Sequence, residues 1–292
     1  MKSCIFKGVA TALYTPFNEK GVDYENFERL IYRQLNSKID CLVILGTTGE
    51  SSTISEKERT EIIKFTINLV NGKIPVVVGT GTNDTSKTIK LTKQSERLNA
   101  DGVLIVTPYY NKCEQDGLIK HYETISSSTR LPIICYNVPS RTGVNIEPET
   151  FKFLKDVKNI VGIKEASNDQ NQIEQIFKIS NGEIAIYSGN DNLNFQFLQY
   201  GASGFISVAS NVIPLKIKDI YSDFINNYEF SSREKNKRLT EFYKALFYKV
   251  NPIPIKAMAE ILYGEKCFLR LPLLKASEMD FEYFKKVLKE IK

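Results

Sequence analysis

The sequence of 292 residues contains a single histidine, His121. Histidine is a major ligand of zinc in proteins, and its pKa suits proton transfer near neutral pH. One histidine therefore argues against a His-rich zinc site and against catalysis by a histidine acid or base. His121 lies in the helix-like segment DGLIKHYETI, where we expect a structural role. If the protein is an enzyme, tyrosine, lysine, threonine or carboxylate groups must transfer its protons.

Cysteine is scarce and scattered. None of the five cysteines lies in a C-x-x-C pair, and an odd number does not suit a complete disulfide framework. We therefore expect reduced and mostly buried thiols, as is usual for cytoplasmic proteins. The cysteines are Cys4, Cys41, Cys113, Cys135 and Cys267.

Long hydrophobic runs are also missing. No apolar stretch approaches the roughly 20 residues that a membrane-spanning helix needs. The first residues, MKSCIFKGVATALYTPF, contain no apolar region that ends at a small-residue cleavage site, so we expect no secretory signal. These absences predict a cytoplasmic protein without a membrane segment.

The net charge of +5 is not concentrated in one place. The densest basic run, REKNKR at residues 233–238, includes a glutamate and falls in a helical pattern. A solvent-exposed helix face explains this run better than a nucleic-acid-binding patch does. We therefore expect no nucleic-acid partner.

What the sequence does contain is a regular alternation of strand-like and helix-like segments. Hydrophobic residues make up 42% of the chain and charged residues 25%, a balance typical of globular proteins. Runs rich in valine, isoleucine and tyrosine each precede a longer segment with apolar residues about 3.6 positions apart. Eight runs read as strands, and they begin at Gly8, Cys41, Ile74, Gly102, Pro132, Ile160, Ile184 and Gly204.

These strands are mostly continuous apolar runs, as expected where a parallel sheet is covered on both faces. Eight of them alternating with helices predict an α/β fold of the (β/α)₈ TIM barrel type. A doubly wound open sheet is the alternative. That fold usually carries a G-x-G-x-x-G nucleotide turn after its first strand, and the motif is absent here.

Helix start signals fit the same alternation. Ser55 and Glu58 form the pattern of a capping box before one helix, and Asp84 precedes another. Pro148 stands where the first turn of a helix tolerates proline.

The strand pattern stops after about Ile225. Residues 231–250 and 278–291 read instead as amphipathic helices. We therefore predict a catalytic barrel at residues 1–225 and a C-terminal helical domain at residues 226–292.

Active sites of (β/α)₈ barrels form at the carboxyl ends of the strands. In this sequence those ends carry mainly hydroxyl groups, with one arginine and one lysine. The segments are GTTGES (46–51), TPYYN (107–111), YNVPSRTG (136–143), KEAS (164–167) and SGND (188–191).

Lys164 lies inside a strand, directly after the apolar run IVGI. If it points inward it is largely desolvated, which disfavours the ammonium form and leaves an amine suited to a Schiff base with a carbonyl substrate. The alternative is a structural lysine that reaches the rim or pairs with an acid. Glu165 is a poor partner, because successive strand residues point to opposite faces. The pattern alone leaves both interpretations open.

Three neighbouring features fit carbonyl chemistry, and each has a plainer alternative. The turn at residues 46–51 combines hydroxyls with backbone amides that can bind a carboxylate or a phosphate, or it is a simple connector. Tyr136 can relay protons, or it is a core aromatic residue. Arg141 can bind a carboxylate through two hydrogen bonds, or it is a surface charge.

Taken in order and spacing, GTTGES, TPYYN, YNVPSRTG, GIKEAS and the late NPIPIK (251–256) resemble the dihydrodipicolinate synthase family. The resemblance extends from about Lys7 to about Leu274. The lysine and the GxxGE turn are shared across the wider superfamily of pyruvate-dependent aldolases, which are (β/α)₈ barrels. GTTGES and YNVPSRTG together are more specific to the synthases.

The resemblance implies a role for each matching residue. It implies that Lys164 forms a Schiff base with pyruvate and that Thr48, with backbone amides, holds the pyruvate carboxylate. It also implies that Arg141 binds the carboxylate of L-aspartate 4-semialdehyde. The implied proton relay consists of Tyr136, Thr47 and Tyr110, and the residues implied to line the pyruvate pocket are Gly189 and Ile206.

The implied reaction adds the pyruvate enamine to the semialdehyde and serves lysine and diaminopimelate synthesis. It needs no cofactor and no metal. Tyr110 matches a tyrosine that reaches into the active site of a neighbouring subunit, which implies at least a homodimer. Tetramers built as a dimer of dimers are common in the family.

One departure from the family concerns inhibition by lysine. Inhibited members bind lysine at the subunit interface, where a histidine and an acidic residue are typical; Glu56 and Lys87 occupy those positions here. Ser51, Asn83 and Tyr109 match the family pattern. Lys87 places a cation where the amine of lysine needs an anion, so we expect weak or absent inhibition.

Two other functions were weighed. N-acetylneuraminate lyase and 2-keto-3-deoxy-sugar-acid aldolases share the lysine and tyrosine but not, as a rule, the PSRTG loop. A catalytically silent barrel with a binding role is expected to lose Lys164, Tyr136 or Thr47, and the sequence retains all three.

Overall fold

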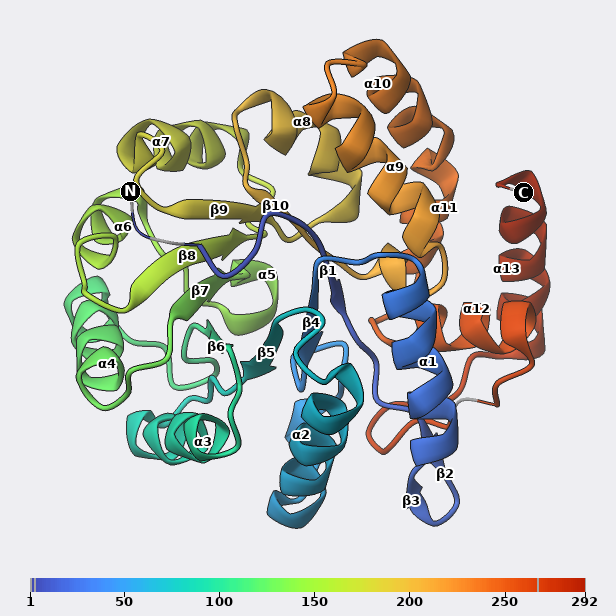
Figure 1. The fold of residues 1–292 in the computed structure, drawn as a ribbon, viewed down its shortest axis with the longest axis horizontal. Coiled ribbons are helices and arrows are strands. Elements are labelled where there is room, and N and C mark those ends of the chain that lie inside the picture. The colour runs from blue at the N-terminus through green and yellow to red at the C-terminus, as the bar shows by residue number, and fades with distance from the viewer. Residues whose placement is uncertain (1, 3, 267, 292) are drawn as a thin grey trace.

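Eight parallel strands form a closed barrel in the computed structural model, which describes residues 2, 4–266 and 268–291 (Figure 1). Each strand pairs with its neighbours in chain order, and the last pairs with the first. All eight strands predicted from the sequence are present. They are β1 (Gly8–Ala12), β4 (Cys41–Ile44), β5 (Val76–Gly79), β6 (Gly102–Val106), β7 (Ile133–Asn137), β8 (Ile160–Glu165), β9 (Ala185–Ser188) and β10 (Gly204–Ser207).

Helices follow the strands and surround the barrel, so the predicted (β/α)₈ architecture is confirmed. The strand residues are almost all buried, which explains why the strands read as continuous apolar runs. The helices between the strands are α1 (Tyr24–Asn36), α2 (Glu56–Val70), α3 (Thr85–Arg97), α4 (Gln115–Ser127), α6 (Pro148–Leu154), α7 (Gln170–Ser180), α8 (Asn194–Gln199) and α9 (Pro214–Ile225).

The predicted helix starts are found where the sequence placed them. Ser55 and Glu58 make both hydrogen bonds of a capping box at the start of α2. The side chain of Asp84 accepts a hydrogen bond from the amide of Ser86 and caps α3. Pro148 is the first residue of α6. The first amides of a helix have no hydrogen-bond partner within the helix. The Ser55 and Asp84 side chains accept hydrogen bonds from such amides, and Pro148 has no amide hydrogen that needs a partner.

Several short elements lie in the loops and were not predicted. Some of them form the rim at which the strands end, and α5 carries a candidate site residue. They are the hairpin of β2 (Phe17–Asn18) and β3 (Gly21–Val22), the helix α5 (Pro139–Thr142), and the 3₁₀ turns η1 (Ser51–Thr53), η2 (Asp191–Leu193) and η3 (Ala209–Asn211).

The helices beyond Ile225 differ in part from the prediction. The segment 231–250 contains two helices, α10 (Glu229–Arg238) and α11 (Thr240–Leu246), that meet at Leu239. The last helix is α13 (Glu278–Glu290), as predicted. We did not predict α12 (Ile253–Tyr263), which begins within the NPIPIK motif. Its prolines fall at the helix start, where proline is tolerated.

The C-terminal helices lie along one side of the barrel, with α10 against α9 and α12 near α1 (Figure 1). Phe242 of α11, Met258 of α12 and Phe284 of α13 belong to the same buried cluster as Leu30 of α1. A shared hydrophobic core ties this region to the barrel. The domain boundary at Ile225 stays a prediction.

The four cysteines that the structure describes are free thiols, but fewer of them are buried than expected. Cys41 and Cys135 are buried, whereas Cys4 and Cys113 are partly exposed. Cys267 lies outside the described residues. Across the described chain, no helix combines the length and the apolar content needed to cross a membrane.

Candidate active site

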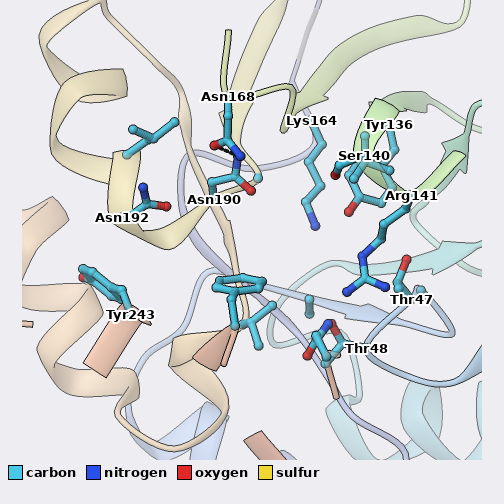
Figure 2. A pocket seen from close by; sticks show the side chains of 18 of the residues that line it. Thr47, Thr48, Tyr136, Ser140, Arg141, Lys164, Asn168, Asn190, Asn192 and Tyr243 are labelled. Carbon is cyan, nitrogen blue, oxygen red and sulfur yellow. Dashed lines mark hydrogen bonds between the residues drawn. The ribbon is translucent and has the colours of Figure 1, made fainter. Parts of the chain in front are cut away.

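A cavity of about 860 Å³ opens at the carboxyl ends of the strands (Figure 2). Its floor is the end of the barrel, where Lys164, Tyr136 and Gly189 lie. One side wall comes from the C-terminal region, through residues of α11 and the segment that follows it. The wall residues are Thr240, Tyr243, Lys244, Phe247, Val250 and Asn251.

Lys164 points from β8 into this cavity (Figure 2). Lys164 is only 4% exposed, and its amine makes no ion pair with any residue that the structure describes. Burial lowers the pKa of the amine to about 8; the charge of Asp191 opposes the shift and the nearby guanidinium of Arg141 adds to it. The pocket thus contains an amine that is partly neutral near physiological pH.

Tyr136 lies beside Lys164, because β7 and β8 pair in a register that places these two residues opposite each other. The Lys164 Nζ atom is 4.3 Å from the centroid of the Tyr136 ring. Burial raises the pKa of the phenol, which keeps it protonated, while Arg141 and a hydrogen bond from Thr47 oppose that shift. The phenol, the amine and the Thr47 hydroxyl therefore form one cluster through which a proton can pass.

The turn at residues 46–51 presents hydrogen-bond donors at the rim of the same cavity. Thr47 and Thr48 both line it, and Asn251 donates a hydrogen bond from Nδ2 to Oγ1 of Thr48 at 2.9 Å. The backbone amides of Thr47 and Thr48 donate to no atom of the described residues. Free amides beside hydroxyl groups can bind a small carboxylate.

Arg141 supplies a cation beside the same cluster. It lies in α5, directly after β7, and Figure 2 shows its guanidinium extending toward Thr47. It lines the main cavity and an adjoining cavity of about 260 Å³. A guanidinium in this position can bind a second carboxylate through two hydrogen bonds.

Gly189 lies close to the end of the Lys164 side chain. A Cβ atom at this position would come within 2.8 Å of the Ala166 Cβ and 3.1 Å of the Lys164 Cε. The first distance is too short for two carbon atoms, so a larger residue would require Ala166 to shift and would crowd the lysine. Glycine is thus required here by close approach, not by backbone conformation.

Two predicted site residues are not in the cavity wall. Ile206 is fully buried inside the barrel, in a cluster with Tyr136 and Ala166, and it does not line the cavity. Tyr110 is 89% exposed and lies outside the cavity of its own chain. The implied role of Tyr110 in a neighbouring subunit requires that exposure but is not tested by it.

Asp191 ends the strand-end segment SGND, and the sequence predicted no role for it. It is 2% exposed, and its carboxylate accepts hydrogen bonds from the Ser207 hydroxyl at 2.5 Å and from the amides of Val208 and Ala209. Its charge acts on the amine of Lys164. The signal in the sequence was an acid at a strand end, but nothing local showed that its charge acts on the lysine.

The contribution of the C-terminal region was also missed. Tyr243 lies in a segment predicted as an amphipathic helix, and nothing in the sequence connected it to the strand ends. Asn251 is the first residue of the NPIPIK motif, to which we assigned no role. Over the described residues, no group of three or more histidine, cysteine, aspartate and glutamate side chains is placed to hold a metal ion.

Comparisons with known proteins agree with one another. The sequence profile of the Dihydrodipicolinate synthetase family matches residues 5–291. The 4-hydroxy-tetrahydrodipicolinate synthase of Thermotoga neapolitana is 48% identical over 290 residues, which cover 98% of this chain and 99% of the relative.

Solved structures give the same result. The dihydrodipicolinate synthase of Thermotoga maritima superposes with a TM-score of 0.97 at 46% identity, over 99% of each chain. A structure described as the first monomeric dihydrodipicolinate synthase variant has a TM-score of 0.96 at 46% identity, and the match covers 98% of this chain and 97% of that one. With the family profile matched over nearly its whole length, this chain belongs to the Dihydrodipicolinate synthetase family.

Proposed function

We propose that this chain condenses pyruvate with L-aspartate 4-semialdehyde, through a Schiff base on Lys164, to give 4-hydroxy-tetrahydrodipicolinate. The enzyme is a lyase of the lysine and diaminopimelate pathway, in agreement with the family to which the chain belongs. The observation that carries the proposal is the buried Lys164 amine, which has a pKa of about 8 and faces a cavity beside Tyr136.

The first half of the reaction loads pyruvate onto the enzyme. The neutral Lys164 amine attacks the ketone carbon of pyruvate, and loss of water from the adduct gives the imine. The carboxylate of pyruvate binds the hydroxyl of Thr48 and the free backbone amides of Thr47 and Thr48. Tyr136 donates the proton that the departing water needs, and Thr47 connects this phenol to the rest of the relay.

The second half forms the carbon–carbon bond. Loss of a proton from the methyl group converts the imine into an enamine, whose carbon attacks the aldehyde of the second substrate. Arg141 holds the carboxylate of that substrate. The amine of the semialdehyde then attacks the imine carbon, closes the ring and releases Lys164 as a free amine.

Subunit assembly completes the proposed site. We infer that Tyr110 of a second copy joins Tyr136 and Thr47 as the third member of the relay, and that Gly189 and Ile206 shape the pyruvate pocket, Ile206 from beneath it. The assembly is a homo-oligomer, with a tetramer of two tight dimers as the expected form. As a biosynthetic enzyme it is expected in the cytoplasm, with no nucleic-acid or membrane partner.

Reductive trapping tests the proposal. Borohydride added to the enzyme with pyruvate should fix one reduced pyruvate per chain, measured by intact-protein mass. Lys164→Ala should abolish the adduct, because no other lysine among the described residues is buried in this cavity. Lys244→Ala is the matched control, since Lys244 also lines the cavity but is exposed and paired with Glu241 at 2.7 Å. The control should keep the adduct.

The outcome distinguishes the synthase from a catalytically silent barrel and from the related aldolases. Absence of an adduct in the unaltered protein would overturn the aldolase interpretation and favour a silent barrel. Turnover with aspartate semialdehyde, and none with N-acetylneuraminate, should distinguish the synthase from the related aldolases.

A further inference from the structure

A second buried lysine, Lys256 of α12, has no part in the chemistry described above. Its Nζ atom lies 2.5 Å from Oε1 of Glu50, and both side chains are almost fully buried, at 1% and 2% exposed. The same Nζ donates to the carbonyl oxygen of Phe268 at 2.8 Å. The other carboxylate oxygen of Glu50 accepts from the backbone amide of Arg270 at 3.2 Å. Glu50 is thus bound to two C-terminal segments.

Glu50 closes the turn that carries Thr47 and Thr48. Its backbone has φ 53° and ψ 40°, in the left-handed region that residues other than glycine rarely adopt. Its amide donates to the carbonyl oxygen of Thr47 at 3.1 Å. A residue held in this region needs contacts that outweigh the strain, and the buried pair supplies them. The conformation of the turn therefore depends on Lys256.

The pair is better suited to fixing geometry than to adding stability. Two charges lose their hydration on burial, and the attraction between them often does no more than offset that loss. Neither Glu50 nor Lys256 lines the cavity, so neither touches a substrate there. Close beside them, Asn251 makes a second link from the C-terminal region to the turn, through Thr48 at 2.9 Å.

We propose that Glu50 and Lys256 are positioning residues, which hold the hydroxyl of Thr48 and the backbone amides of Thr47 and Thr48 where they bind the carboxylate of pyruvate. Through this pair the C-terminal helical region sets the affinity for the first substrate. The second substrate is little affected, because its proposed partner, Arg141, lies on α5 after a different strand. This inference rests on the proposed function and adds the origin of its pyruvate affinity.

The test removes both charges together, so that neither is left buried without its partner. In Glu50→Gln combined with Lys256→Met, the pyruvate concentration for half-maximal borohydride trapping should rise about tenfold or more. The KM for aspartate semialdehyde should change less than about twofold. Lys275→Met is the matched control: this lysine lies in the same region and pairs with Glu260 of α12 at the surface, at 2.9 Å. It should leave both values unchanged.

A milder variant covers the case in which the double variant does not fold, as judged by circular dichroism and thermal unfolding. Glu50→Asp keeps the charge but shortens the side chain by one methylene, so that the turn must shift to keep the ion pair. It should also raise the half-saturating pyruvate concentration selectively.

The results distinguish failure of the positioning role of Glu50 and Lys256 from failure of the proposed function. A folded variant that traps pyruvate with unaltered half-saturation would overturn the positioning role, and so would an equal rise for both substrates. A purely structural pair would lower only the melting temperature. Failure of the unaltered enzyme to trap pyruvate would instead overturn the proposed function on which the inference rests.

Discussion

Two buried lysines in this chain show how surroundings decide what the same side chain can do. Lys256 has a carboxylate at 2.5 Å and a carbonyl oxygen at 2.8 Å, so its ammonium form is satisfied. Lys164 has neither contact among the described residues, and burial lowers its pKa to about 8. Since only the neutral amine is a nucleophile, Lys164 is the residue suited to imine formation.

The pKa of Lys164 gives a prediction for pH dependence. With a pKa of about 8, roughly a tenth of the amine is neutral at pH 7, against less than one in a thousand for an ordinary lysine. The rate of imine formation with pyruvate should therefore rise as pH increases through about 8 and then level off. Stopped-flow measurement of trapping from pH 6 to 10 checks this.

A substitution of Asp191 gives a second test of this pH dependence. Its carboxylate opposes the lowering of the Lys164 pKa, so Asp191→Asn should move the inflection to lower pH. An inflection that stays near 10 in the unaltered enzyme would contradict the assignment of a desolvated amine.

Strand β8 shows what an element adds to its residues. Successive strand residues face opposite sides, and the structure confirms that Glu165 points away from Lys164. Its carboxylate accepts hydrogen bonds from Asn137 at 2.9 Å and from the amide of Ser167 at 2.6 Å. The charges that act on the Lys164 amine come from Asp191 and Arg141, and Glu165 is not among them. This alternation was predictable from the sequence, because it needs only the strand period.

Helix α4 carries the one histidine and gives a prediction for stability. His121 is 6% exposed, its Nδ1 atom lies 2.9 Å from the Thr85 hydroxyl, and its buried Nε2 atom has no partner among the described residues. Burial lowers its pKa to about 4, so the folded state keeps it neutral while the unfolded state takes up a proton below about 6.5. Stability is therefore lost as pH falls through this window.

His121→Gln should reduce that loss. Between pH 7.5 and 4.5, the free energy of unfolding of the unaltered protein should fall by about 2 kcal/mol more than that of the variant. Urea unfolding of both proteins at the two pH values measures the difference. Equal losses in the two proteins would show that His121 is not held neutral by the fold.

At the scale of the whole molecule, the exposed Tyr110 is the residue that points to assembly. It has φ 76°, an unusual backbone conformation for a bulky residue, and 89% of it is exposed. Lys164→Ala and Tyr110→Phe should each be nearly inactive alone. In a mixed dimer, one of the two sites combines an intact Lys164 with an intact Tyr110, so mixing should restore up to about half the activity per dimer.

Activity of refolded mixtures checks this prediction, with Tyr248→Phe as a control at another exposed tyrosine. Full activity of Tyr110→Phe by itself would contradict a role in the relay. Mixtures no more active than the parent variants would show that no site is shared between subunits.

Feedback by lysine is the other property that depends on the assembly. Glu56 pairs with Lys90 at 2.7 Å, and Lys90 and Lys87 both lower the pKa of this carboxylate. Glu56, the anion at the site where inhibited family members bind free lysine, is thus already close to two cations. We expect half-inhibition only at millimolar lysine or above, and Lys87→Glu should increase sensitivity. A coupled assay that shows half-inhibition of the unaltered enzyme at micromolar lysine would contradict this.

The sequence by itself determined the barrel, the eight strands, the helix caps and the identity of the candidate nucleophile. Each of these depends on local periodicity or on a motif of a few residues. A lysine after an apolar strand, a threonine-rich turn and a PSRTG loop are visible without coordinates, as is the shortage of histidine.

Only the tertiary structure decided which distant residues complete the site. Asp191 and Asn251 acquire their roles through space, the first because its charge acts on the Lys164 amine and the second because it donates a hydrogen bond to Thr48. The same is true of the pair between Glu50 and Lys256, which are 206 positions apart. The family resemblance implied that Ile206 lines the pyruvate pocket, whereas its side chain is buried in a core cluster and is not among the residues that line the cavity. Burial and pairing depend on packing between elements, and no local pattern encodes that packing.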